Sequence, residues 1–179
     1  MRHHLLSVTL LAAALAAVAG CSSTPPAHPP GGARADLKPT NGQQTAGWVM
    51  FHAQGDGVFM HARVSGLKPG QQHGFHIHEK GDCSSGDGMS AGDHFNPGGA
   101  PHGAPQGEHH AGDLPALSAD ANGVAEMKVH LPGLAIGSGA ANIAGRGLIV
   151  HADPDDYRTQ PSGNSGARIA CAVIATVQR

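Results

Sequence analysis

The feature that most constrains this chain is a histidine-rich segment that runs from residue 73 to residue 113. Glycine and proline are so frequent in its second half that a helix or a central strand is excluded there. A single histidine is usually a hydrogen-bonded core or surface residue, but this density, together with Asp113, favours a metal site folded from a long loop. The histidines of the segment are His73, His76, His78, His94, His102, His109 and His110.

The first part of the segment, HGFHIHEKGDC, predicts a short strand. His76 and His78 are two residues apart, and residues at this spacing point to the same face of a strand. Phe75 and Ile77 would then point to the opposite face, where a hydrophobic core can take them. Imidazole nitrogens with one carboxylate, and without a nearby pair of thiolates, suit zinc or copper and argue against an iron–sulfur cluster or a cysteine zinc site.

The rest of the chain alternates between short strand-like runs and turns. GWVMFHA and VFMHARVSGL are separated by QGDG and predict a hairpin, in which His52 and His61 have no partners at ligand spacing. VAEMKVH follows the turn DANG, a buried run from Leu148 to Val150 ends at His151, and ARIACAVIATVQ predicts one long last strand. With 27 glycines and little helical periodicity, the pattern favours an all-β sandwich or barrel.

The first residues have the features of an exported protein. Residues 1–20 combine a basic start, an apolar run and small residues, as in a secretory signal peptide, and the run is too short for a good membrane-spanning helix. The residues from Val18 to Cys21 also resemble a bacterial lipobox, so both a plain signal peptide and a lipidated Cys21 are open. Residues 21–44 are rich in proline, glycine and polar residues and predict a flexible tether. The formal net charge of −2 gives no reason to expect nucleic acid as a partner.

Five segments together resemble the copper/zinc superoxide dismutases, in particular the bacterial periplasmic lipoprotein type. They are GFHIHEKGDC, AGDHFNPGGAPHG, HHAGDLP, GRGLIVHADPDD (residues 145–156) and GNSGARIACAVI (residues 163–174). The resemblance covers residues 45–179, follows the order of the family, and implies an eight-stranded Greek-key β-barrel with one long metal-binding loop and one long channel loop. It also implies an enzyme that dismutates superoxide to dioxygen and hydrogen peroxide. The alternative is a copper/zinc storage or delivery protein on the same fold.

The resemblance implies one copper ion and one zinc ion per subunit, bridged by His94. The family's motifs assign copper to His76, His78, His94 and His151, and zinc to His94, His102, His110 and Asp113. The spacing of HxGD favours His110 over His109, which we expect to be a bystander.

The resemblance also assigns roles around the metals. Asp155 would join a copper histidine, His76, to a zinc histidine, His102, and Arg168 would attract and position the anionic substrate. His73 would be structural rather than a ligand, and Lys80 is a candidate second cation for steering the substrate.

The cysteine count and the export signal complete the prediction. If Cys21 carries lipid, Cys83 and Cys171 remain as a pair, and a disulfide persists in an oxidising compartment. We therefore expect a periplasmic protein, monomeric or homodimeric, that contacts the membrane only through a lipid anchor at Cys21. It would protect the cell envelope from superoxide.

Overall fold

A computed structural model describes residues 32–177 of the chain, and the fold in this range is all-β, as predicted. Ten strands and one short 3-10 helix, η1 (Met89–Ala91), follow one another along residues 32–177. The strands are β1 (Gly32–Pro39), β2 (Ala46–Gln54), β3 (Gly57–Ser65), β4 (Gln72–His73), β5 (Phe75–His78), β6 (Leu117–Ser118), β7 (Ala125–Pro132), β8 (Gly147–His151), β9 (Arg168–Val173) and β10 (Ala175–Thr176).

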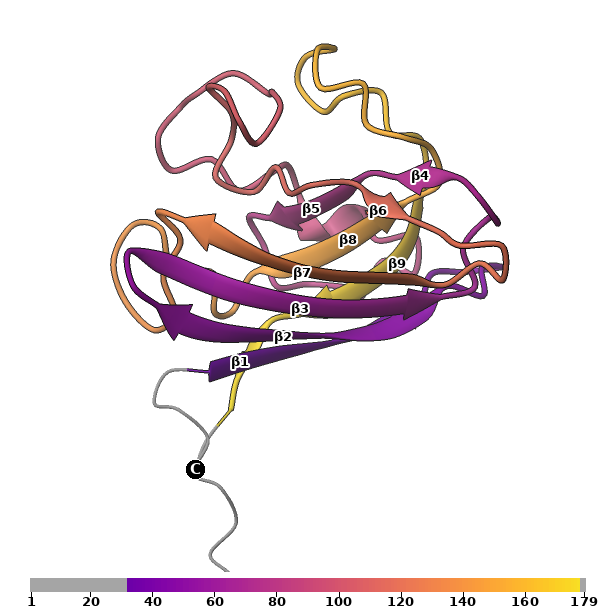
Figure 1. Ribbon diagram of the computed structural model, residues 1–179, viewed down its shortest axis with the longest axis horizontal. Coiled ribbons are helices and arrows are strands. Elements are labelled where there is room, and N and C mark those ends of the chain that lie inside the picture. Colours follow the sequence, from indigo (N-terminus) through magenta and orange to yellow (C-terminus); the bar gives the residue numbers. More distant parts are fainter. Residues whose placement is uncertain (1–31, 178–179) are drawn as a thin grey trace, which may run out of the picture.

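Eight of the strands form one curled antiparallel sheet in the order β5-β8-β9-β1-β2-β3-β7, with β10 also paired to β1. Strands β4 and β6 form a separate pair. The predicted hairpin is confirmed as β2 and β3, which are in register from Ala46↔Ser65 to Gln54↔Gly57. The chain passes between distant parts of the sheet after β3 and again after β7, as in a Greek key (Figure 1).

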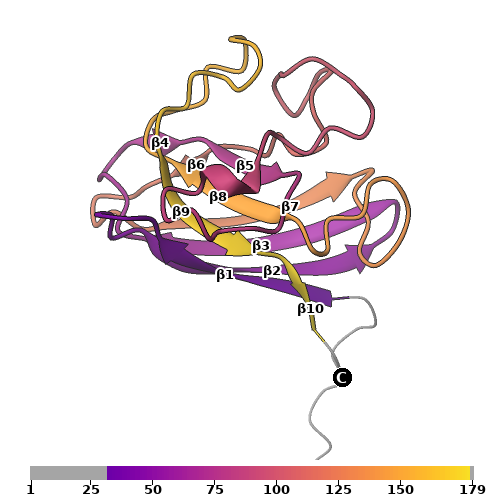
Figure 2. The same ribbon diagram turned by 180° about the vertical axis from the view of Figure 1, so that it is seen from behind.

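The core lies between two layers, one formed by β1, β2, β3 and β7 and the other by β5, β8 and β9 (Figures 1 and 2). Alternation along each strand sends every second side chain inward. Phe51 and Met60 from the first layer, and Phe75 and Leu148 from the second, are all 0% exposed. The strands of the second layer therefore have a rigid support on one side, and their other side is available for function.

One sequence prediction is wrong: residues 32–39 do not belong to the tether but form β1, between β2 and β9. Ala33, Ala35 and Leu37 alternate with polar residues, and all three are buried in the core. Their mostly small side chains make the segment look polar in the sequence, but the alternation of the strand turns every second one toward the core. The predicted signal peptide (residues 1–20) and Cys21 lie outside the described residues.

The predicted single last strand is also corrected, because it is divided at Ile174 into β9 and β10. Strand β9 pairs with β8, whereas β10 pairs with β1. Ile174 is 0% exposed, and its backbone bonds to Arg146 and Gly145 in the turn before β8. The chain changes partner at this point, and a run of β-branched residues does not reveal such a change.

Two long loops project on the same side of the second layer (Figure 2). We call residues 79–116, between β5 and β6, the metal loop, and residues 152–167, between β8 and β9, the channel loop. Within residues 32–177, no helix is long and apolar enough to cross a membrane.

Candidate metal centre

Strand β5 presents His76 and His78 toward the loops, as the alternation predicts. Phe75 and Ile77 on its opposite face are 0% exposed and belong to the main core. The two histidines are also 0% exposed, because the loops cover the face on which they lie. The strand therefore holds two imidazoles on a packed support and away from water.

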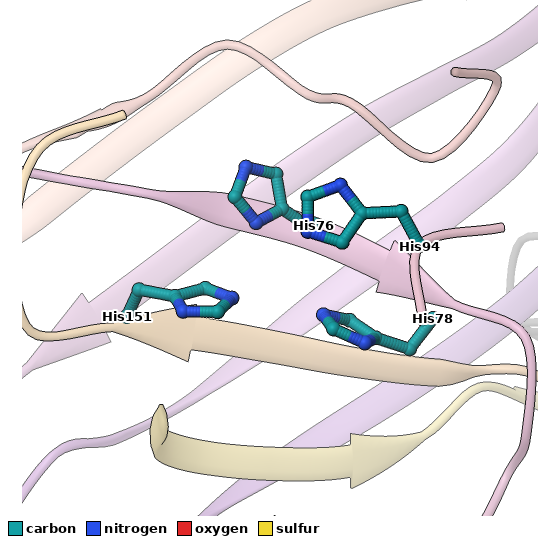
Figure 3. A group of neighbouring side chains, drawn as sticks. All are labelled: His76, His78, His94 and His151. Carbon is teal, nitrogen blue, oxygen red and sulfur yellow. The ribbon is translucent and has the colours of Figure 1, made fainter. Parts of the chain in front are cut away.

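His94 and His151 complete a first group with the two histidines of β5, and the four rings lie around one shared space (Figure 3). His94 forms an isolated antiparallel bridge with His78, and its neighbour Phe95 donates a backbone hydrogen bond to the carbonyl of Ile77 at 2.8 Å. His151 ends β8, where the pairing with β9 is irregular. The ring centroid of His76 lies 4.1 Å from that of His94 and 4.8 Å from that of His151.

A second group is built from the metal loop alone. In each group, one ligand atom per residue lies within 4.8 Å of all the others. The Oδ1 atom of Asp113 lies 2.7 Å from Nδ1 of His94 and 3.3 Å from Nδ1 of His110, and its Oδ2 lies 3.0 Å from Nδ1 of His102. The structure thus brings together both predicted sets: His76, His78, His94 and His151, and His94, His102, His110 and Asp113.

Hydrogen bonds identify the ring nitrogens that carry a lone pair in the first group. Nδ1 of His78 bonds to the carbonyl of Gly92 at 2.9 Å, and Nδ1 of His151 bonds to the carbonyl of Gly166 at 3.3 Å. A carbonyl only accepts, so both Nδ1 atoms carry the hydrogen and both Nε2 atoms keep a lone pair. Nε2 of His76 donates in the same way to Asp155, which leaves its Nδ1 free.

The free nitrogens are the test of whether this group fits a metal. Nδ1 of His76 and Nε2 of His78, His94 and His151 are buried and have no hydrogen-bond partner among the described residues. A buried polar atom without a partner costs about 1–3 kcal/mol, so four in one place would be strongly destabilising in an inert domain. Four imidazole lone pairs directed into one space fit a copper ion.

The second group passes a similar test. His102 donates from Nε2 to Asp155 at 2.9 Å, so its Nδ1 is an acceptor that faces the acceptor Oδ2 of Asp113 at 3.0 Å. Two buried acceptors at this distance repel each other unless a cation lies between them. Three imidazole nitrogens and one carboxylate are a donor set that suits zinc.

His94 belongs to both groups through different atoms. Its Nδ1 faces Asp113 at 2.7 Å, while its Nε2 is the unpartnered nitrogen of the first group. A deprotonated imidazole has a lone pair on each nitrogen, so one ring can bind two ions. This division of the two nitrogens provides a physical basis for the predicted bridge.

Asp155 connects the two groups through hydrogen bonds to one histidine of each. Its Oδ2 accepts from Nε2 of His76 at 2.7 Å, and its Oδ1 accepts from Nε2 of His102 at 2.9 Å and from the backbone N–H of Tyr157 at 2.7 Å. The carboxylate side chain is 1% exposed. A side chain at Gly163 would collide with it, and φ is +67° at that position, so glycine is required there.

Burial keeps His76, His78 and His151 neutral. It lowers the pKa of His76 and His78 well below 6.5, with added repulsion from His94 on both and from Arg168 on His78. It lowers the pKa of His151 to about 4, against the opposing hydrogen bond to Gly166. Desolvation disfavours the charged imidazolium, so the lone pairs that a metal needs are present at neutral pH.

Arg168 stands at the start of β9, beside a pocket of about 390 Å³ that His94 also lines. Its Nη1 and Nη2 donate to the carbonyls of Gly88 and Gly92 at 2.8 Å and 2.7 Å, which hold the guanidinium in one orientation. Burial lowers the pKa of Arg168, but a guanidinium stays protonated in proteins. The pocket residues are Met89, Asp93, His94, Asn96, His110, Pro161, Ser162 and Arg168.

Lys80 is not among these pocket residues. Its side chain is 64% exposed, and its Nζ lies 3.6 Å from Oε1 of Glu79. The neighbouring glutamate offsets the charge that Lys80 would offer to an anion. The structure therefore gives Lys80 no place in the pocket beside Arg168.

The predicted disulfide between Cys83 and Cys171 is present, with the two Cα atoms 5.9 Å apart. It ties the metal loop to β9 close to Arg168. Cys171 is buried with Ala91 and Ile149 in a small cluster of its own. The bridge thus supports the part of the loop whose carbonyls, at Gly88 and Gly92, hold Arg168.

The other histidines of residues 32–177 lie outside the two groups, as predicted. Nδ1 of His109 bonds to the carbonyl of His110 at 2.6 Å, and Nδ1 of buried His73 bonds to the carbonyl of His151 at 2.9 Å. His61 pairs with Glu126 on the outer face of the sheet at 3.0 Å.

Two contributions are missing from the sequence predictions. The carbonyls of Gly92 and Gly166 set the tautomers of His78 and His151, and Gln160 binds the backbone of His102. No pattern in the sequence predicts these two contributions. The glycines act only through backbone carbonyls, and Gln160 is a single glutamine in a polar loop.

Fold and site together define an all-β metalloprotein with two adjacent donor sets that share one histidine. A model of the family described as copper/zinc superoxide dismutase (SODC) matches residues 45–174. The superoxide dismutase-like protein YojM of Bacillus subtilis (strain 168) is 37% identical over 191 residues, covering 96% of this chain and 96% of that protein. The chain belongs to the copper/zinc superoxide dismutase family.

Solved structures agree with this assignment. A SOD-like protein from Bacillus subtilis matches with a TM-score of 0.71 and 39% identity, covering 78% of this chain and 96% of that chain. A double mutant of a SOD-like protein from Bacillus subtilis, in which histidines replace a tyrosine and a proline, matches with a TM-score of 0.72 and 41% identity. The match covers 79% of this chain and 96% of that chain.

Proposed function

We propose that this protein dismutates superoxide to dioxygen and hydrogen peroxide at a copper site that His94 bridges to zinc. The observation that carries the proposal is the division of the two nitrogens of His94 between two donor sets, beside a pocket that Arg168 also lines. A bridged pair of ions next to a fixed positive charge suits electron transfer to and from a small anion.

The proposed cofactors are one copper ion and one zinc ion per subunit. His76, His78, His94 and His151 would hold copper, and His94, His102, His110 and Asp113 would hold zinc. Copper, when bound, supplies the one-electron redox chemistry, which zinc does not have. The two donor sets fit this division, because four imidazoles suit copper and the carboxylate lies only in the second set.

The residues around the pocket have distinct tasks. Arg168 attracts and orients the anion, because its planar guanidinium is held by two carbonyls and keeps its charge. His94 is the residue positioned to carry a proton at Nε2, because its Nδ1 remains fixed at Asp113. Asp155 keeps His76 and His102 in the tautomers that ligation requires.

A second function is a copper/zinc storage or delivery protein on the same fold. The names of the relatives are compatible with this second function, because they are "superoxide dismutase-like" and "SOD-like" rather than dismutase. The retained donor sets and Arg168 favour the enzyme, since storage needs neither a bridging ligand nor a cation beside the pocket.

Metal analysis and a superoxide assay on the soluble part of the chain distinguish the two functions. We expect the loaded protein to dismutate superoxide, and His94→Ala to lose most of this activity while His76, His78 and His151 retain part of the copper. His109→Ala is the matched control, because that histidine lies outside both sets. Full copper content without activity in the unaltered protein would favour storage or delivery.

We further propose a location in the periplasm, with the chain anchored to the cell envelope through a lipid on Cys21. The basis is the sequence of residues 1–21 alone. Cys21→Ser should abolish labelling by radioactive fatty acid, because the sulfur that accepts the lipid is removed. Equal labelling of the variant and the unaltered protein would rule out the anchor.

A further inference from the structure

The side chain of Gln160, in the channel loop, forms two hydrogen bonds with the backbone of a single residue of the metal loop. The backbone N–H of His102 donates to Oε1 of Gln160 at 2.9 Å, and Nε2 of Gln160 donates to the carbonyl of His102 at 2.9 Å. The amide thus occupies both backbone groups of His102, as a neighbouring strand would.

This pair of bonds completes the fixation of a predicted zinc ligand. The Nε2 atom of His102 already donates to Asp155, and its Nδ1 faces Asp113. The ring is therefore oriented by one residue of the channel loop, Asp155, and the backbone by another, Gln160. Among residues 32–177, no residue of the metal loop forms a hydrogen bond with the backbone of His102.

The same part of the channel loop forms the rim of the pocket. Pro161 and Ser162 follow Gln160 directly, and they line the pocket together with His94 and Arg168. A second link between the two loops lies close by, where the backbone N–H of Ala116 donates to the hydroxyl of Tyr157 at 2.9 Å. Gln160 therefore links His102, a predicted zinc ligand, to the two residues of the channel loop that line the pocket.

We propose that Gln160 is a positioning residue that couples metal occupancy of the second donor set to the shape of the pocket rim. When an ion orders His102, the two bonds to its backbone hold Gln160, and Gln160 holds Pro161 and Ser162 in place. The inference rests on the proposed function in that it takes the two donor sets to be metal sites.

The test uses Gln160→Ala, with Gln43→Ala as the matched control. Gln160 is exposed, so truncation removes its bonds without opening the core, and Gln43 is an exposed glutamine in the turn between β1 and β2. Cobalt(II), an optically visible substitute for zinc, reports binding at the second donor set. Hydrogen exchange of the Gly163 amide, which bonds to the carbonyl of Thr159 at 2.7 Å, reports order at the rim.

We expect Gln160→Ala to weaken cobalt binding about tenfold or more, the usual effect of losing a residue that orients a ligand. In the unaltered protein and in Gln43→Ala, cobalt should slow exchange of the Gly163 amide. In Gln160→Ala, exchange should already be fast, and cobalt should change it less, which is the signature of coupling. Unchanged exchange in β2 and β3 would show that the variant is folded.

The inference is overturned if Gln160→Ala binds cobalt as tightly as the unaltered protein, or if cobalt slows Gly163 exchange equally in both. Neither readout requires turnover. Absence of superoxide dismutation in the unaltered, metal-loaded protein would therefore count against the proposed function, while leaving the coupling by Gln160 measurable.

Discussion

Replacement of Asp155 by asparagine should lower the metal affinity of one donor set more than that of the other, because the two oxygens of this carboxylate have different partners. Oδ1 accepts two hydrogen bonds, from Nε2 of His102 and from the backbone N–H of Tyr157, whereas Oδ2 accepts one, from Nε2 of His76. Asparagine has the same shape but only one oxygen. Its orientation therefore decides which histidine loses its acceptor.

Two donors at the Oδ1 position hold the amide oxygen of the asparagine there. Its NH₂ group then faces Nε2 of His76, where the carboxylate oxygen is 2.7 Å away in the unaltered protein. Two N–H groups repel, so His76 must move its proton to Nδ1, the atom that faces the first donor set. The proposed copper site loses a lone pair, while His102 keeps its acceptor and the proposed zinc site is disturbed less.

Loss of such an orienting partner lowers metal affinity about 10- to 100-fold. At about 1.4 kcal/mol for each factor of ten, this is a loss of about 1.4–2.8 kcal/mol at the proposed copper site. Chelator competition, run separately for copper and zinc, measures both affinities. Asp153→Asn is the control, because that exposed carboxylate lies in the same loop and makes no side-chain hydrogen bond to either metal set. Equal losses for both metals, or a larger loss for zinc, would refute the reasoning.

Three further predictions follow from individual residues. Arg168→Gln should lower the rate constant for superoxide about tenfold or more and should flatten its dependence on ionic strength, because steering of an anion is screened by salt. The rate constant of Arg168→Lys should be intermediate. An unchanged rate constant and an unchanged salt slope for Arg168→Gln in stopped-flow measurements would show that Arg168 does not steer the substrate. In the metal-free protein, the pKa of His151 is lowered from 6.5 to about 4. This shift contributes about 3 kcal/mol of stability above pH 6.5, and that stability is lost as the pH falls toward 4. Denaturant titrations at several pH values should show the loss, and stability that rises on acidification would contradict it. Leu37→Ala in β1 should destabilise the protein by about 2–5 kcal/mol, because removal of a side chain that is only 1% exposed leaves a cavity in the core. Thermal unfolding measures the effect, and an unchanged melting temperature would show that residues 32–39 do not contribute to the core.

The local spacing of residues predicts much of the site. Alternation places His76 and His78 on one face of a strand and Phe75 and Ile77 on the other, and the structure has this arrangement. The family motifs select His110 over His109, and the structure includes only His110 in the second group. These predictions hold because they depend on strand periodicity and on ligand order along one loop, both of which are properties of short stretches of sequence.

By itself, the sequence predicted the all-β class and the β2–β3 hairpin from periodicity. The resemblance to the family predicted the residues of both donor sets, which the structure brings together. Only the tertiary structure decided that residues 32–39 form a strand between β2 and β9, because its pairing partners are distant in sequence and the side chains of Ala33 and Ala35 are too small to signal a buried face. It alone showed that Gln160 binds the backbone of His102, which lies 58 positions earlier in the chain. The physical reason is the same in both cases. Small side chains and backbone hydrogen bonds stabilise the fold only through contacts with neighbours that are distant in sequence, and a linear pattern does not specify those neighbours.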